Sequence, residues 1–193
     1  MARGMKRLTA ISLLLTAVFS GLTLAGFDWA VPYAITFCTC LYHFSMRFLV
    51  GYAFNRTMGN KADYSRGWYQ LRSFEKRLYR FLKVRKWKGK MPTYDPSLFD
   101  PALHSWEEIA QAMCQAELVH EVIVVLSFLP LLAAVTFGAF GVFLITSWVS
   151  ASYDLCFVIM QRFNRPRILK FLRISKGHYK SEKHRCSNGT TNQ

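Results

Sequence analysis

The sequence predicts an all-α integral membrane protein, with four transmembrane helices in two hairpins and a basic cytoplasmic loop that contains amphipathic helices. The first observation is that 52% of the 193 residues are hydrophobic and lie in long apolar stretches. The second is a net charge of +14, from 25 Lys and Arg against 11 Asp and Glu. All but one of the basic residues fall outside the apolar stretches. A nucleic-acid-binding protein would carry this charge on one face of a soluble fold, so no nucleic acid partner is expected.

The first hairpin lies in the apolar stretch from residue 8 to residue 52. A bilayer core needs about 20 apolar residues per helix, so this stretch is long enough for two spans. We expect helices at about 8–26 and 29–52. Basic residues before the first helix are also typical of secretory signal peptides, but the apolar region is longer than the usual run of about 7–15 residues. An uncleaved anchor is therefore expected.

The second hairpin lies in the apolar stretch from residue 122 to residue 160, whose one charge is Asp154. It divides near Gly138 and Gly141, which predicts helices at about 116–135 and 139–160. Upstream, Ser105 is followed three residues later by Glu108. This spacing is the signature of a capping box, so we expect a helix that begins at Ser105 and continues into the third span.

The basic residues define the topology. Three precede the first helix, twelve lie between residues 56 and 90, and nine lie between residues 162 and 185. The two turns on the opposite side contain no Lys or Arg. Because basic loops remain in the cytoplasm, this pattern places both termini, loop 53–115 and tail 161–193 on the cytoplasmic side of the cell membrane. We treat residues 1–193 as a single membrane domain.

The loop contains aromatic and leucine residues at mostly helical spacing between residues 68 and 82, with basic residues among them. This pattern predicts an amphipathic basic helix. Such a helix can lie in the plane of the lipid headgroups, or it can be solvated and pack on its own domain. Both alternatives remain open at this point.

Ionisable and polar side chains within or beside the spans are candidates for function, because an unpaired charge there costs several kcal/mol. His43 and Arg47 are four residues apart and share a face of the second helix. Glu117, His120 and Glu121 can share a face of the third helix. A further set crowds the cytoplasmic end of the fourth helix: Asp154, Gln161, Arg162, Asn164, Arg165 and Arg167.

These residue types suggest acid–base chemistry beside an anion-binding group of arginines. His120 can act as a general base toward a hydroxyl, with Glu117 orienting the imidazole. Arg162, Arg165 and Arg167 can donate hydrogen bonds to a phosphate, a carboxylate or a developing oxyanion. The alternative is structural: Glu117 or Glu121 pairs with an arginine from residues 162–167 and holds two helices together. No second histidine cluster lies at metal-ligand spacing, so no metal site is expected. The sequence has no P-loop and no dinucleotide-binding glycine motif, so no bound cofactor is expected.

Three segments carry a resemblance to a known family. They are VRKWKGKMP at 84–92, QAELVH at 115–120 and QRFNRPR at 161–167. Together they resemble motifs of the glycosyl-4,4'-diaponeurosporenoate acyltransferases of the staphyloxanthin carotenoid pathway, over about residues 79–172. The resemblance implies a membrane enzyme that moves a fatty acyl group onto the C6 hydroxyl of a glucosyl carotenoid carboxylate.

Such an enzyme would use an acyl thioester as co-substrate, either acyl-CoA or an acyl carrier protein. Its other partners would be membrane lipids and a lipid-linked glycosyl acceptor. We expect His120, Glu117, Arg162 and Arg165 to be catalytic. The residues expected to bind substrate are Trp87, Lys88, Gln161, Asn164, Arg167, His43 and Arg47.

Two other functions fit the same pattern. One is a non-enzymatic lipid-binding or assembly protein, whose polar residues form a structural ion-pair network. The other is a different small membrane transferase or a reductase that binds a soluble cofactor in its basic loops.

Overall fold

The computed structural model describes residues 2–93 and 95–189, and every regular element in these residues is a helix. Four long helical segments are apolar enough to cross a membrane: Arg3–Leu24, Asp28–Met58, Trp106–Phe137 and Phe140–Gly177. Their outer surfaces are apolar, with Leu14, Val125 and Ile145 all more than 60% exposed. A surface of this kind matches lipid rather than water, so the chain is a helical membrane protein.

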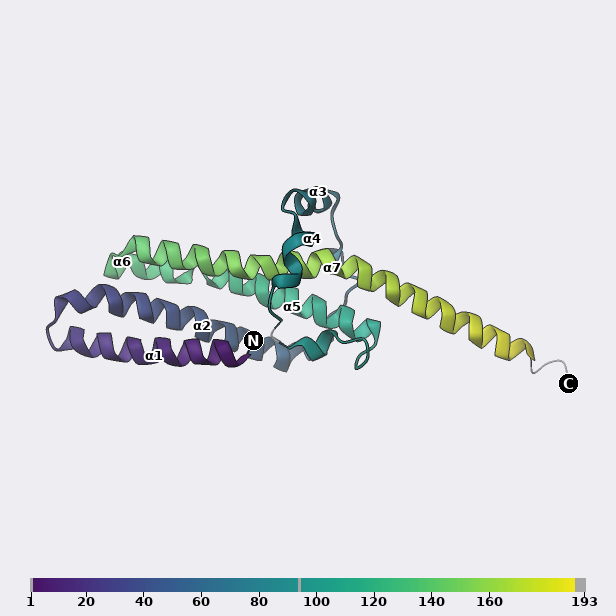
Figure 1. The fold of residues 1–193 in the computed structure, drawn as a ribbon, viewed down its shortest axis with the longest axis horizontal. Coiled ribbons are helices and arrows are strands. Elements are labelled where there is room, and N and C mark those ends of the chain that lie inside the picture. Colours follow the sequence, from purple (N-terminus) through teal and green to yellow (C-terminus); the bar gives the residue numbers. More distant parts are fainter. Residues whose placement is uncertain (1, 94, 190–193) are drawn as a thin grey trace.

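The long helices lie side by side (Figure 1). Helix α1 (Ala2–Leu24) packs along α2 (Val31–Met58), and α5 (Trp106–Leu126) packs along α7 (Phe140–Gly189). Helix α2 also contacts both α5 and α7, which joins the two pairs into one bundle. The segment between α2 and α5 lies at one end of this bundle, which we call the loop end. Beyond it, α7 extends as a long single helix (Figure 1).

The third span is broken where a continuous helix at 116–135 was expected. Helix α5 ends at Leu126, a 3-10 helix follows at Leu129–Ala133, and the short α6 covers Ala134–Phe137. Pro130 explains the change, because proline lacks the N–H of an α-helical hydrogen bond and clashes with the preceding turn. Gly138 then adopts a φ of +65°, which suits glycine, and reverses the chain into α7.

The fourth helix is longer than the expected 139–160, because α7 continues to Gly189 with Pro166 inside it. The residues after 160 are rich in Arg, Lys, Leu and Ile, most of which favour helix. Similarly, α2 continues past residue 52 to Met58 and is stopped by Gly59 in the left-handed conformation. The polar segments that flank the apolar stretches are therefore partly helical.

The start of α5 confirms the predicted capping box. The Ser105 Oγ accepts a hydrogen bond from the Glu108 N–H, and the Glu108 carboxylate accepts one of 2.8 Å from the Ser105 N–H. From there the helix continues without interruption past Glu117 and His120. At the other end of the preceding loop, the N–H of Asn60 donates to Gln115 Oε1 at 2.7 Å, so the loop is attached to the same helix.

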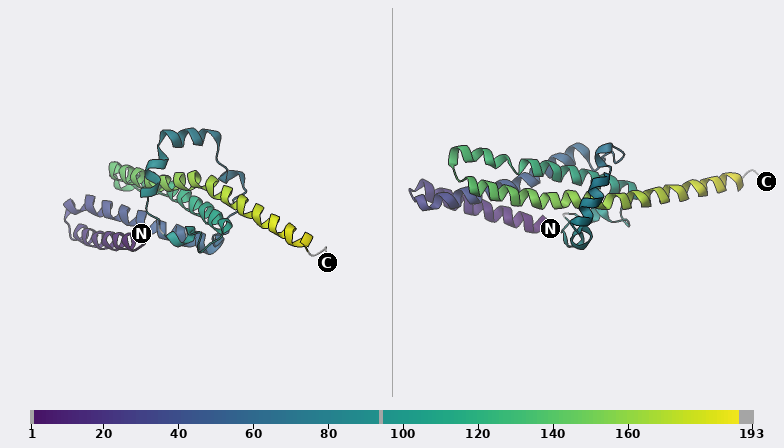
Figure 2. Two further views of the ribbon diagram at one scale, coloured as in Figure 1. Left: turned by 45° about the vertical axis from the view of Figure 1, so that its right-hand side comes forward. Right: turned by 90° about the horizontal axis from the view of Figure 1, so that it is seen from above.

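The loop contains less helix than the single amphipathic helix that the pattern at residues 68–82 predicted. A 3-10 turn covers Gly67–Tyr69, α3 covers Ser73–Phe81 and α4 covers Val84–Trp87. Figure 2 shows α3 standing away from the bundle. Helix α3 is amphipathic in an unusual sense, because Glu75 and Tyr79 are buried while Phe74, Leu78 and Phe81 are exposed. An exposed apolar row of this kind can insert among lipid headgroups, so the location of α3 at the membrane surface stays a prediction.

Charge substitution on the outer surface tests the membrane assignment. Leu14 lies near the middle of α1 and is 64% exposed, and Leu103 in the loop has the same exposure. We expect Leu14→Arg to lower the amount of protein retained in alkali-washed membranes, because an arginine at the centre of a span costs about 2.5–3.5 kcal/mol. Leu103→Arg should be retained like the wild type. Equal retention of the two variants would contradict the assignment.

Candidate active site

Helices α5 and α7 bring their polar residues together in register. Moving forward along α5, Glu117 meets Arg162, His120 stacks on Phe157, and Ser127 meets Ser150. The residue number of the partner on α7 decreases at each step, as antiparallel packing requires. The shared interface therefore contains a charged cluster near the loop end and a second polar group deeper in the bundle.

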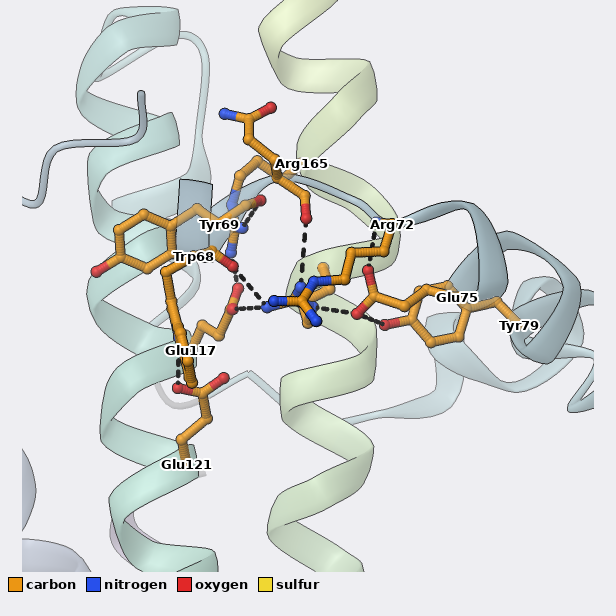
Figure 3. Close-up of polar contacts among 10 residues, drawn as sticks. Trp68, Tyr69, Arg72, Glu75, Tyr79, Glu117, Glu121 and Arg165 are labelled. Carbon is orange, nitrogen blue, oxygen red and sulfur yellow. Dashed lines mark hydrogen bonds and ion pairs between the residues drawn. The ribbon is translucent and has the colours of Figure 1, made fainter. Parts of the chain in front are cut away.

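The charged cluster is centred on Glu117, whose side chain is fully buried. One carboxylate oxygen accepts a hydrogen bond of 2.6 Å from Arg162 Nη1, and the other pairs with Arg165 Nη2 (Figure 3). The Arg165 side chain is only 1% exposed. Glu117, Arg162, Arg165 and Glu75 form what we call the arginine cluster. The structural alternative, in which Glu117 pairs with an arginine of residues 162–167, is what the geometry shows.

The arginine cluster also holds the loop against the bundle. Arg162 Nε donates to Glu75 Oε1 of α3 at 2.7 Å, and Arg165 Nη1 donates to the backbone carbonyl of Tyr69 at 2.6 Å. The carbonyl of Trp68 accepts a further bond of 3.1 Å from Arg162 (Figure 3). Three segments distant in sequence, α3, α5 and α7, therefore depend on two guanidinium groups.

The electrostatics of Glu75 and Tyr79 follow from this arrangement. Burial alone would raise the pKa of the Glu75 carboxyl, but the hydrogen bonds from Arg162 and from the Arg72 N–H lower that pKa below its ordinary value. Burial, followed by the charge of Glu75, raises the pKa of Tyr79 to about 12. Glu75 is thus ionised and Tyr79 neutral near pH 7.

His120 is held by Asp154. The Nδ1 of His120 lies 2.8 Å from Asp154 Oδ1, and its ring stacks on Phe157 with centroids 4.6 Å apart. A carboxylate can only accept, so Nδ1 carries the proton and Nε2 is the unprotonated nitrogen of the neutral ring. Asp154 is 1% exposed, whereas the His120 side chain is 23% exposed. This is the geometry of an oriented general base.

The expected orientation of His120 by Glu117 is wrong. The two residues are one turn apart on α5, but both Glu117 oxygens are engaged by arginines of α7. Asp154, the lone acid in the apolar stretch from residue 122 to 160, takes the predicted place of Glu117 at the imidazole. The isolated charge of Asp154 was the one indication in the sequence of its role. The sequence could not assign Asp154 to His120, because that assignment requires knowing how α5 and α7 pack.

Arg47 is the counter-ion of Asp154. Its Nη2 pairs with Asp154 Oδ2 and also donates to the Ser150 hydroxyl at 2.9 Å. Arg47 therefore connects α2 to the His120 site. His43, one turn away, is 5% exposed, and neither ring nitrogen has a hydrogen-bond partner among the described residues.

The residues expected to bind substrate are only partly brought together. The Lys88 ammonium donates to Asn164 Oδ1 and lies 4.8 Å from the centroid of the Phe163 ring. Burial, with the nearby charges of Arg167 and Arg85, lowers the pKa of Lys88. Trp87 instead donates to the Leu82 carbonyl at 3.0 Å. Gln161 is buried in the α7 interface and Arg167 is exposed.

In the described part of the chain, no group of three or more His, Cys, Asp or Glu side chains is arranged to hold a metal ion. The expectation that no metal and no cofactor are bound stays a prediction.

Comparison with known families decides the affiliation. A model of the glycosyl-4,4'-diaponeurosporenoate acyltransferase family matches residues 65–174, which is more than half of the chain. The chain belongs to this family. The match confirms the resemblance carried by the three sequence segments, and it includes both the arginine cluster and the His120–Asp154 pair. Membership supports an acyltransferase activity at the level of the family. No curated protein and no solved structure matches the chain.

Residues 65–174 begin after α2, so Arg47 and His43 lie outside the match. The family motifs are therefore found in the loop, α5 and the first part of α7. Helix α2 contributes the counter-ion of Asp154 from outside the matched region.

The arginine cluster predicts unequal effects for two glutamates of α5. Glu117→Gln leaves Arg162 and Arg165 without a carboxylate between them, and breaking a buried pair in this way costs about 3–5 kcal/mol. Among the described residues, the Glu121 carboxylate accepts one hydrogen bond, of 3.0 Å from Trp68 Nε1, so Glu121→Gln should cost below about 1 kcal/mol. Thermal unfolding in detergent measures both variants. Equal losses would contradict a structural role specific to Glu117.

The low pKa of Glu75 predicts a dependence of stability on pH. The ionised carboxylate stabilises the fold above its ordinary pKa of 4.5, and this contribution is lost as the pH falls through the lowered pKa of the folded state. The melting temperature of the wild type should therefore fall more steeply below about pH 4.5 than that of Glu75→Gln. Parallel curves for the two proteins would show that the pair does not contribute.

Proposed function

We propose that the protein is a membrane acyltransferase that moves a fatty acyl group from a thioester donor onto a hydroxyl of a glycosylated lipid, such as a glucosyl carotenoid. We further propose that it acts in the cell membrane with both termini in the cytoplasm. The observation that carries the proposal is the His120 imidazole, which is oriented by buried Asp154 within the region matched by the family. Its ring is 23% exposed and lies one turn from the charged cluster near the loop end, where a lipid and a polar donor can meet.

The chemistry of this pair is general base catalysis. The Nε2 of His120 accepts the proton of the acceptor hydroxyl as its oxygen attacks the thioester carbonyl carbon. The tetrahedral intermediate then collapses, the carbon–sulfur bond breaks, and the departing thiolate takes the proton from His120. Asp154 holds the ring in the required tautomer and stabilises the imidazolium between these steps. The products are an ester and a free thiol.

Arg47 completes the site as a positioning residue. An unpaired carboxylate in the bundle would be costly, and Arg47 supplies the compensating charge. Because the arginine occupies Oδ2, the other oxygen of Asp154 remains directed at His120. Arg47 of α2 thereby acts on the chemistry through Asp154.

The arginines of α7 have a supporting role in this mechanism. Arg162 and Arg165 donate to carboxylates and to carbonyls of the loop, and this fixes α5 against α7 one turn from His120. We therefore propose them as positioning residues rather than as the oxyanion donors expected from sequence. Lys88 and Asn164 form a polar pair that suits the sugar of the acceptor. Substrate contacts by Trp87, Gln161, Arg167 and His43 stay predictions.

Substitution of the pair tests the proposal. His120→Gln and Asp154→Asn should lower acyl transfer about 10²–10⁴-fold, the usual contribution of a general base. His104→Gln is the matched control, because His104 lies at the edge of the loop with Glu108 at 3.8 Å. The assay is mass spectrometry of lipids in membranes supplied with acyl thioester and glycolipid, and the product is a lipid heavier by one acyl group.

The non-enzymatic alternative predicts a different result. If the polar residues are only an ion-pair network, no lipid gains an acyl group in the wild type, and the variants change stability alone. Full activity of His120→Gln would remove the mechanism. Stabilisation by a methyl donor or a nicotinamide, instead of an acyl thioester, would favour another transferase or a reductase.

A further inference from the structure

A basic cleft lies at the loop end, between the loop and α7. It consists of two hollows of about 280 and 210 Å³, which share Gln70, Leu169 and Arg173 in their walls. One wall is the loop segment 64–76 and the other is the part of α7 at 165–176. Because three residues line both hollows, we treat them as one cleft.

The charge of this cleft has one sign. Its exposed cations are Lys76, Lys170 and Arg173, and no carboxylate is among the described residues that line either hollow. Lys176, at one end, pairs with Glu107 at 2.9 Å. None of the other three cations has a carboxylate within salt-bridge distance in the described part of the chain. Clustered and uncompensated cations of this kind attract an anionic ligand.

The cleft is adjacent to the candidate active site. Arg165 lines the second hollow and also pairs with Glu117. Glu117 is three residues before His120, which corresponds to about 4.5 Å along the axis of α5. On α7, Lys170 and Arg173 come 13 and 16 residues after Phe157, on which His120 stacks, so these cations lie roughly 20–24 Å from the imidazole along the helix axis. The arginine cluster lies between the cleft and the imidazole.

The walls also have an apolar part. Leu71, Leu169 and Leu172 line the cleft together with Tyr64 and Tyr69. A ligand that combines an anionic group with an uncharged, partly apolar chain would contact both kinds of surface. Lipids and thioester donors both have this composition, but the walls come from the loop and from the polar part of α7, which a donor arriving from water can reach.

We propose that this basic cleft binds the phosphate of the phosphopantetheine arm of the acyl donor, with Lys76, Lys170 and Arg173 as the phosphate ligands. The inference rests on the proposed function and names the donor side of the same reaction. Acyl-CoA and acyl carrier protein share this phosphate, so the cleft accommodates the group common to both. The arm then leads the thioester toward His120 past the arginine cluster.

Binding to the full-length protein in lipid nanodiscs tests the cleft. The probes are CoA, phosphopantetheine and pantetheine, measured by calorimetry. We expect CoA and phosphopantetheine to bind and pantetheine to bind at least tenfold more weakly, because it lacks the phosphate. Lys170→Gln combined with Arg173→Gln should weaken the binding of CoA at least tenfold. Lys86→Gln combined with Lys90→Gln is the control, because these exposed cations lie outside the cleft, and it should bind CoA like the wild type.

Several results would contradict the binding of the donor phosphate in the cleft. These are equal binding of pantetheine and phosphopantetheine, or equal losses in the two double variants. A third is the result that the cleft variant binds CoA like the wild type but retains less phosphatidylglycerol when it is purified. That result would show that the cleft binds a lipid instead of the donor. In assays with acyl-CoA and with acyl carrier protein, the cleft variant should raise KM for the natural donor with little change in kcat.

The two proposals fail in different ways. His120→Gln should bind CoA like the wild type, because His120 does not line the cleft. CoA binding without any acylated lipid would refute the proposed function and leave the cleft as an anion site. Acyl transfer with an unchanged KM for the donor in the cleft variant would refute donor binding in the cleft and would leave the proposed acyltransferase function supported.

Discussion

The buried Glu117 carboxylate, placed between Arg162 and Arg165, is the interaction on which the rest of the structure depends. In an apolar interface neither the acid nor the two arginines can remain unpaired without a large cost. The same guanidinium groups also bind Glu75 and the carbonyls of the loop. One requirement for charge compensation therefore sets the register of α5 on α7 and attaches the loop beside it.

The register has a chemical consequence deeper in the bundle. With Glu117 opposite Arg162, the next inward-facing residue of α5 is His120, and it meets Asp154 and Phe157 of α7. Arg47 of α2 then compensates Asp154. The candidate base is thus oriented by a charge network with one member from each of three helices. The basic cleft lies beside the arginine cluster, because Arg165 both lines the cleft and pairs with Glu117.

Sequence predicted much of this arrangement. Apolar length identified the four membrane helices, and the spacing of Ser105 and Glu108 identified the start of α5. The helix ends were less predictable, because Pro130 interrupts the third span while Pro166 does not stop α7. Among the site residues, His120 and Glu117 were recognised as polar groups in an apolar setting. The ion pair between Glu117 and an arginine of residues 162–167 was one of two alternatives, and the orientation of His120 was assigned to Glu117, one turn away on the same helix, instead of to Asp154.

The sequence by itself determined the class of molecule: apolar length specifies helices that cross a membrane, and three short motifs specify the family. These properties are local, since each is contained in one continuous segment. Only the tertiary structure decided that Asp154 orients His120, that Arg47 balances Asp154, and that Arg162 and Arg165 close on Glu117. Those pairings join residues at least 34 positions apart, and which charges meet depends on the register of packed helices.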